Sequence, residues 1–513
     1  MPEEFDKLEP EPDEPAPQGR RRFFSVRNAG ILAVVLAFIG LAFVVSIYIA
    51  YRGGVVDTYV EDQFTTKMAD IGIVFSADEF DVTVSPFELH LVNATFNNKT
   101  TGEKLFFIRD ARLGLSVVDV FSWSLSRDIS INTTDINGAE VWITFDENGR
   151  SNYSDLVFVE EEGARVNFRY DSIVFSLKEG VVHYGLATHS ISGDANNVVV
   201  NIEPEPEPAS PELASAAESL QSVPSEELRF VINASATDSV FVWDGSPLNE
   251  IDIRAHGVAY GNGADVHELR IDSPIGTMAM NGKITNWADL TYELNVESTV
   301  DLTQTSNTFP METTLRGVAN FRGKILGQGA TYHIEGTADS QALSADNVYL
   351  KAVNIEGTVA GTNANYEANG TAVAELLTYG DFRVEFPRMV GNIRGTGTDF
   401  RWVGELQAAA VKAGSMTIGN LFLSDATAEL NDQKVDLAAG SGRAQKFSVG
   451  DTEFQELIVR NLGFANQNGV TTVTGSSANA QSMKLGENSF SGMTGGDLLV
   501  KTGNGQTDVN IKN

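Results

Sequence analysis

The chain has 513 residues, 42% of them apolar, a net charge of −33 and no cysteine. This composition excludes a disulfide scaffold, a cysteine zinc site, an iron–sulfur cluster and a thiol nucleophile. The negative charge disfavours nucleic acid as a partner, because both molecules would repel each other.

An uncharged stretch near the N-terminus is nearly all apolar between Ile31 and Ala50. Twenty residues at about 1.5 Å each span about 30 Å, the thickness of a bilayer's hydrocarbon core. A cleaved signal peptide is the alternative, but its apolar run is only about 7–15 residues long and ends in small residues. We therefore expect a transmembrane helix over residues 29–51. Its expected membrane-facing side chains are Ile31, Leu36, Phe38, Leu41, Phe43 and Ile47.

The charges that flank this stretch predict its orientation. Four arginines precede it, namely Arg20, Arg21, Arg22 and Arg27, and only Arg52 follows closely. The positive-inside rule then keeps residues 1–28 in the cytoplasm, as a disordered tail, and exports the rest. A large exported body without cysteine is typical of a bacterial envelope protein. We expect a single-pass inner-membrane protein whose bulk lies in the periplasm.

Residues 52–202 begin with apolar side chains at helical spacing, including Val56, Phe64 and Met68. This pattern predicts a short amphipathic helix between residues 55 and 70 that packs against the first strands. After residue 71 the apolar period changes from 3.6 to 2, which predicts β-strands.

An acidic, proline-rich stretch at 203–227 is predicted to be a loop or linker. The strand pattern resumes over 228–335, where the longest alternation runs from Leu290 to Leu302. Alternation places these apolar side chains on one face of a strand. We expect this face to line an apolar groove. The predicted lining residues are Leu290, Tyr292, Leu294, Val296 and Val300.

Residues 336–513 contain similar segments that open on a glycine every 34 to 36 residues. These glycines are Gly336, Gly370, Gly404, Gly440 and Gly475. Chance spacing in a glycine-rich chain is the alternative, but a regular step of this size is typical of repeat architectures. Two or three strands fit each unit, and an extended repeat of strands curls into a trough or a solenoid. An open trough would attract acyl chains or an unfolded strand, and free sheet edges would attract added strands.

Residues 57–155 resemble the start of the AsmA/TamB envelope family. The similarity rests on PFELHL at 86–91, NATF at 93–96, TGEKL at 101–105, ARLGLS at 111–116, GAEV at 138–141 and DENGRSN at 146–152. The resemblance implies a mostly β, elongated antiparallel β-taco, or repeating β-groove, after one transmembrane helix. It also implies transport of phospholipid acyl chains from the inner toward the outer membrane.

The TamB branch of this family implies an alternative function, a scaffold for assembly of outer-membrane β-barrels with a TamA-like barrel partner. Family members are typically longer, so the resemblance predicts a fragment or a short relative and leaves partner engagement open. A third possibility is a structural or adhesive β-solenoid, which an uncleaved inner-membrane anchor disfavours.

No residue pattern predicts catalysis. His183 and His189 are expected to be surface side chains rather than metal ligands. No paired carboxylates and no G-x-S-x-G motif are apparent. We therefore expect neither an enzyme nor a bound cofactor or metal.

Overall fold

The computed structural model describes most of the chain after residue 55. The described ranges are 56–84, 87–117, 127–147, 150–156, 166–169, 173–187, 190–206, 228–287, 291–309, 311, 313–397, 399–431, 434–467, 470–503 and 506–511. The predicted anchor, its flanking arginines and most of the predicted linker lie outside these ranges. Among the helices that are described, none combines the length and apolar content needed to cross a bilayer.

The prediction of a mostly β protein is confirmed, since 80% of the described residues lie in strands. The two described helices are α2 (Val56–Asp70) and α4 (Leu302–Thr308). The strands of the first half are β1 (Ile73–Ser76), β2 (Glu79–Val84), β3 (Phe87–Asn98), β4 (Lys104–Val117), β5 (Arg127–Phe145), β6 (Val166–Arg169), β7 (Val174–Leu186), β8 (Ile191–Pro204), β9 (Arg229–Trp243), β10 (Ser246–Tyr260), β11 (Gly263–Ser273), β12 (Gly276–Asn286) and β13 (Thr291–Asp301).

The second half continues in the same way. Its strands are β14 (Leu315–Gln328), β15 (Thr331–Ala345), β16 (Val348–Thr362), β17 (Asn365–Val373), β18 (Leu376–Tyr379), β19 (Phe382–Glu385), β20 (Arg388–Thr396), β21 (Asp399–Ala413), β22 (Met416–Asn431), β23 (Lys434–Val449), β24 (Thr452–Gln467), β25 (Val470–Gly475), β26 (Ser477–Leu485), β27 (Asn488–Gly495), β28 (Leu498–Gly503) and β29 (Gln506–Ile511).

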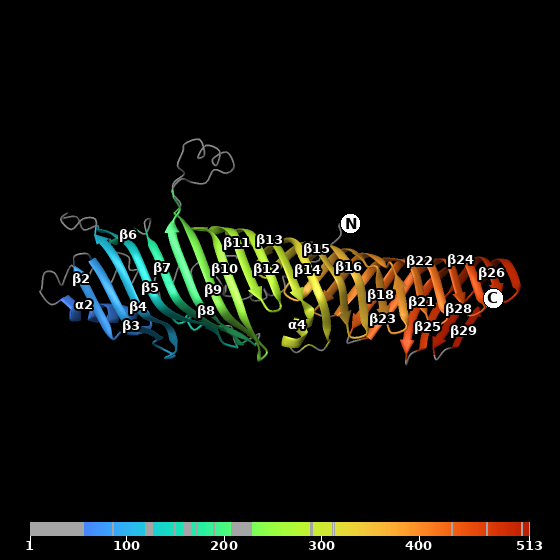
Figure 1. The fold of residues 1–513 in the computed structure, drawn as a ribbon, viewed down its shortest axis with the longest axis horizontal. Coiled ribbons are helices and arrows are strands. Elements are labelled where there is room, and N and C mark those ends of the chain that lie inside the picture. Colours follow the sequence, from blue (N-terminus) through green and yellow to red (C-terminus); the bar gives the residue numbers. More distant parts are fainter. Residues whose placement is uncertain are drawn as a thin grey trace, which may run out of the picture.

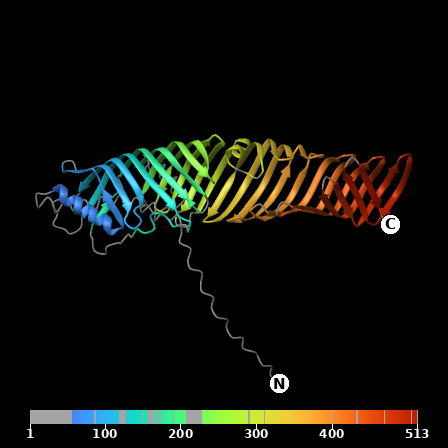
Figure 2. The ribbon, with the colours of Figure 1, turned by 90° about the horizontal axis from the view of Figure 1, so that it is seen from below.

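All described strands belong to one 29-stranded sheet. Neighbouring strands pair antiparallel, except that β5 pairs in parallel with β6 and β7. The strands follow one another along the longest axis of an elongated body, with α2 and β2 near one end and β26 and β29 near the other (Figure 1). In the perpendicular view the strands run obliquely across the body along its whole length (Figure 2).

Helix α2 occupies the predicted position and lies against β1 and β2. It contributes the fully buried Phe64 and Met68 to an N-terminal core. Phe75 packs edge-on against Phe64 at 4.5 Å, and Phe96 stacks on Phe106 at 4.1 Å between ring centroids. Burial of each such ring contributes about 1.5–3 kcal/mol, which holds the helix on the strand ends.

Tight turns recur along one edge of the sheet at residues 346, 380, 414, 450 and 486, in steps of 34 to 36. The first turn residue has a positive φ of 49–58° at each of these positions, and it is glycine at four of the five. Glycine tolerates this conformation because it lacks a Cβ. Where the strands are long, as in β21 to β24, the chain forms two strands between one such turn and the next.

Two expectations need correction at strand ends. The alternation through Leu302 predicted a strand residue, but β13 ends at Asp301 and Leu302 begins α4. The Asp301 carboxylate caps this helix by accepting hydrogen bonds from the backbone N–H groups of Thr303 and Gln304, at 2.9 and 3.0 Å. The predicted linker began at residue 203, yet β8 continues to Pro204.

Candidate functional site

Strand β13 carries four of the five predicted groove residues on one face. Val296 is buried, and Tyr292, Leu294 and Val300 are half-buried, whereas the alternate side chains from Glu293 to Thr299 are exposed. We call the face that carries Val296 the inner face. Leu290 lies outside the described residues. The sequence therefore predicted which side chains of this strand share a face.

Cross-strand register extends the inner face of β13 over six more strands. Leu294 pairs with Ile325, which pairs with Ile334, and the series continues across the sheet. Its members are apolar in every strand, and we call them the aliphatic row. The aliphatic row consists of Leu294, Ile325, Ile334, Val359, Ala368 and Ile393, and it ends at the aromatic Trp402.

A row of glycines runs beside the aliphatic row on the same face. Six consecutive strands, from β14 to β17 and then β20 and β21, place a glycine directly opposite the next one. This glycine row consists of Gly323, Gly336, Gly357, Gly370, Gly391 and Gly404. A Cβ added at Gly336 would lie 2.5 Å from the carbonyl oxygen of Arg322 and 2.8 Å from the Cα of Gly323. The backbones approach so closely that only glycine fits, which is typical of a sharp bend in a sheet.

A third row alternates aromatic residues with glycines near the ends of the same strands. Tyr292 lies opposite Gly327, and Tyr332 lies opposite both Gly327 and Gly361. Tyr366 and Phe400 continue the alternation around Gly395. An added Cβ at Gly361 would lie 2.5 Å from the Tyr332 hydroxyl, so each ring covers the glycine beside it. We call Tyr292, Tyr332 and Tyr366 the tyrosine row.

The inner face encloses a cavity of about 330 Å³ between β18 and β28. Its wall is apolar almost throughout, with Trp402 and Leu406 on one strand and Leu457 and Val459 on another. Leu437, on β23, also lines this cavity and is 45% exposed. Water-accessible apolar surface costs roughly 25 cal/mol per Å², so an apolar ligand would be stabilised here.

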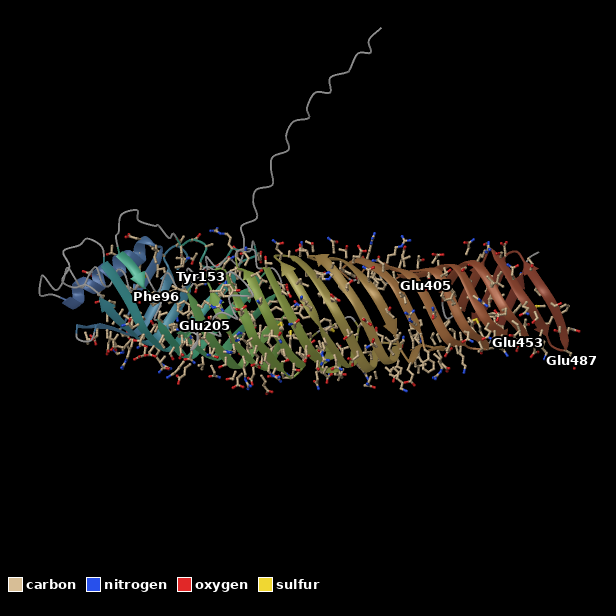
Figure 3. All side chains as sticks on the ribbon, turned by 90° about the horizontal axis from the view of Figure 1, so that it is seen from above. Phe96, Tyr153, Glu205, Glu405, Glu453 and Glu487 are labelled. Atoms are coloured by element: carbon tan, nitrogen blue, oxygen red, sulfur yellow. The ribbon has the colours of Figure 1, made fainter. Side chains whose placement is uncertain are left out.

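The face opposite the inner face is polar and carries cross-strand ion pairs. Arg322 lies 2.9 Å from Glu297, Lys446 lies 2.7 Å from Glu453, and Lys324 pairs with Glu293. Charged side chains project along the body, and Figure 3 labels Glu405, Glu453 and Glu487 among them. Exposed pairs of this kind contribute about 0–1 kcal/mol each, so this face mainly provides solubility.

The N-terminal end of the inner face is filled rather than hollow. The buried side chains there come from α2 and from β1 to β5, and they include Phe64, Phe80, Leu91 and Leu105. Tyr153 covers this core, and its hydroxyl donates to the carbonyl of Leu105 at 2.7 Å. Burial raises the pKa of Tyr153 above the ordinary tyrosine value of 10.0. This part of the sheet is therefore a folded core.

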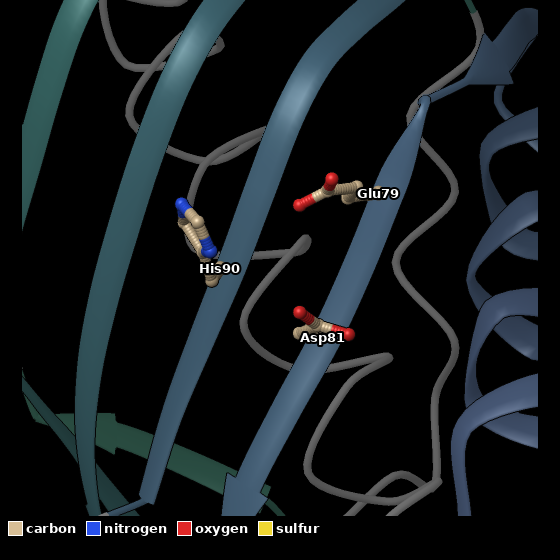
Figure 4. Close-up of side chains that lie close together, drawn as sticks. All are labelled: Glu79, Asp81 and His90. Atoms are coloured by element: carbon tan, nitrogen blue, oxygen red, sulfur yellow. The ribbon is translucent and has the colours of Figure 1, made fainter.

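One cluster on β2 and β3 could supply metal ligands. Glu79, Asp81 and His90 hold three potential ligand atoms within 4.8 Å of one another (Figure 4). Both carboxylates are exposed, and His90 Nε2 already lies 3.0 Å from Asp110 Oδ2. Arg112 lies directly opposite His90 in the register and brings a positive charge beside it. The arrangement is that of an open surface cluster.

His183, which was predicted to be a surface residue, is half-buried and has neighbours that the sequence did not reveal. Its Nδ1 lies 2.7 Å from Asp194, its Nε2 lies 4.0 Å from Glu140, and its ring stacks on Trp142. Strand pairing brings both carboxylates beside the imidazole. His189 lies outside the described residues.

The glycine and tyrosine rows were missed because they depend on register between strands. One local signal marks them: each of these six strands places its two row residues four positions apart, as in Tyr332 and Gly336 or Tyr366 and Gly370. The glycines of the glycine row also follow in alternate steps of 13 and 21 residues.

Comparison of the sequence with protein-family models found no match, and comparisons with curated proteins and with solved structures found none either.

Proposed function

We propose that this chain carries phospholipids along an apolar β-groove between two membranes. The observation that supports this function best is the uninterrupted aliphatic row, which leads across seven strands to an apolar cavity of about 330 Å³. An acyl chain matches such a surface because it is long, narrow and without hydrogen-bonding groups. In this proposal the sheet is a β-taco that bends along its glycine row.

The proposed location is the periplasm, with the chain held in the inner membrane by residues 29–51. The charges before that stretch and the absence of cysteine from the sequence support it. Since α2 and its aromatic core fill the described end nearest the anchor, lipids would enter the groove through its long open side. A barrel protein of the outer membrane is a proposed partner, on the family resemblance alone.

A charge placed in the lipid path tests this function. Ile355 lies on the inner face, because it pairs with Ala338 and Ala372 beside the glycine row, and it is 47% exposed. An aspartate there keeps its hydration in the empty protein but must be desolvated when an acyl chain passes. Val403 is the matched control, since it is also β-branched and 42% exposed, on the opposite face of β21.

The assay measures transfer of a fluorescent phosphatidylethanolamine from donor vesicles that carry the full-length chain to acceptor vesicles. We expect Ile355→Asp to slow transfer by at least about tenfold, because desolvating the carboxylate costs more than ~1.4 kcal/mol. Val403→Asp should transfer at the wild-type rate. Equal rates for all three proteins, or no transfer by the wild type, would contradict the proposal.

A scaffold for outer-membrane barrel assembly is the second candidate, and one feature favours it. Within the described residues, β27 pairs with β26 alone, and in this proposal its other side accepts a strand of the client protein. A photoreactive residue at an exposed position of β27, such as Ser489, should then crosslink to barrel precursors. If a probe at Ser489 crosslinks to no barrel precursor while probes on the inner face crosslink to lipid, this candidate fails.

A further inference from the structure

The apolar cavity between β18 and β28 is continuous with the aliphatic row. Trp402 is the last member of that row and also lines the cavity. Beyond Trp402 the same cross-strand register continues through side chains that are all apolar. They are Ala428, Leu437, Phe464, Val473 and Val500, and all but Ala428 line the cavity. The inner face of the middle strands therefore leads directly into the cavity wall.

The inner face changes from open to enclosed along this path. Ile355 on β16 is 47% exposed, whereas Trp402 on β21 is 6% exposed and Val500 on β28 is 2% exposed. Strands far apart in the order of the sheet supply opposite parts of the cavity wall, since Met389 on β20 and Leu498 on β28 both line it. An acyl chain that follows the row thus passes from a solvent-facing surface into a space enclosed by the sheet.

The volume of the cavity indicates how much lipid it can hold. It measures about 330 Å³, roughly twice the ~150 Å³ of a cavity that takes up one benzene molecule. By that measure it has room for about 12 carbon atoms, which is most of one acyl chain and too few for two.

The wall of the cavity excludes the polar part of a lipid. Aliphatic and aromatic side chains make up most of it. Among the described residues, Arg443 is the only charged one in the wall, and its guanidinium pairs with Glu456 at 2.8 Å at the exposed surface. A phosphate or ammonium group inside the cavity would lose its hydration without compensation, so the headgroup stays outside.

We propose that this cavity is a terminal subsite that holds the methyl end of one acyl chain, while the second chain and the headgroup of the same phospholipid stay on the open groove. This inference rests on the proposed function and adds where the lipid stops and how much of it is enclosed. An acyl chain is about 15 Å long, half the hydrocarbon core of a bilayer, which is about three strand spacings. A chain whose end lies beyond Trp402 therefore keeps its ester on β16, β17 or β20.

Two photoreactive phosphatidylethanolamines locate the acyl chain without any substitution. One carries a diazirine at the methyl end of an acyl chain, and the other carries it next to the ester. Each is loaded into the full-length chain, and the crosslinked peptides are identified by mass spectrometry. We expect the methyl-end probe to label the cavity strands β22 to β24, and the ester-end probe to label β16, β17 and β20 instead.

Filling the cavity tests whether its space is required. Ala426→Leu/Ala444→Leu adds an isopropyl group at two buried residues of the wall, which together take up about half of the room. Ala360→Leu/Ala409→Leu is the control and adds the same groups at exposed positions of β16 and β21. We expect the filled variant to lose at least about tenfold in methyl-end labelling of β22 to β24, because each excluded CH₂ group lowers affinity about fourfold. The control should equal the wild type.

Amide exchange in β22 to β24 shows whether the filled variant keeps its fold, and if it does not, the comparison of the two probes in the wild type decides alone. Equal labelling of β22 to β24 by both probes overturns the terminal subsite and leaves the groove function intact. The same holds if a folded filled variant retains methyl-end labelling there. If neither probe labels the inner face of the wild type, the groove function and the subsite both fail.

Discussion

The glycine row makes the most direct structural prediction, and Gly336→Ala tests it. An added Cβ would lie 2.5 Å from the Arg322 carbonyl oxygen and 2.8 Å from the Gly323 Cα, and both are backbone atoms of the paired strand. Overpacking of this kind costs about 1–3 kcal/mol. Replacing glycine also reduces the conformational freedom of the unfolded chain, and this offsets about 0.4–1 kcal/mol of that cost. The net destabilisation should be about 1–2 kcal/mol.

Gly419→Ala is the matched control. Gly419 also lies inside a long strand, β22, but an added Cβ there would meet the nearest atom, Lys446 Cβ, at 3.6 Å, which is ordinary contact. This variant should be neutral or slightly stabilising. The two substitutions add the same methyl group, so a difference between them reports the local backbone geometry.

Amide hydrogen exchange is the suitable assay, because an elongated repeat opens locally rather than in one transition. A destabilisation of 1–2 kcal/mol should speed exchange of β14 to β16 amides by about 5- to 30-fold in Gly336→Ala. Exchange in β26 and β27 should not change. If Gly336→Ala exchanges no faster than Gly419→Ala, the close backbone approach at Gly336 does not require glycine.

Three further predictions concern other parts of the chain. Phe96→Ala removes a fully buried ring and should cost about 3–5 kcal/mol, seen as lost exchange protection in α2 and β1 to β4 while β21 to β24 stay protected. Because burial raises the pKa of Tyr153, the stability linked to its protonation is present below about pH 10 and is lost as the pH rises further. Urea denaturation should therefore show a smaller fall in the free energy of unfolding between about pH 8 and pH 11 for Tyr153→Phe than for the wild type. Asp301→Ala should destabilise α4 by about 1 kcal/mol through loss of its cap, measured as faster exchange in residues 303–308; unchanged exchange there would contradict the capping role.

Local pattern was sufficient to predict the strand class and the first helix. The period-two spacing of Tyr292, Leu294 and Val296 identified one face of β13, because side-chain direction alternates in any strand. The helical spacing around Phe64 and Met68 placed α2 within a residue or two. Both patterns lie within one segment, and neither requires knowledge of what the segment touches.

The strand end at Asp301 and the rows across the sheet could not be predicted in this way. Asp301 continues an alternating pattern, and only its hydrogen bonds to the next turn of chain convert the following residues into a helix. The glycine row depends on register, which is a relation between segments 13 or 21 residues apart. Two neighbours of His183, Glu140 and Trp142, depend on β7 pairing with β5 in parallel, and Asp194 depends on the antiparallel pairing of β7 with β8. Alternation encodes neither pairing.

The recurring turns have a consequence for how such a molecule changes in evolution. Each step of 34 to 36 residues ends at an equivalent point on the same edge of the sheet. Deleting or duplicating one whole step would therefore restore the register on both sides of the join and keep the inner face inward. The body would shorten or lengthen by about two strand spacings, roughly 9.6 Å. An insertion of an odd number of residues inside a strand would instead turn the rest of that strand's inner-face side chains outward. Whole steps are therefore the changes that alter the length of the body and keep its inner face intact.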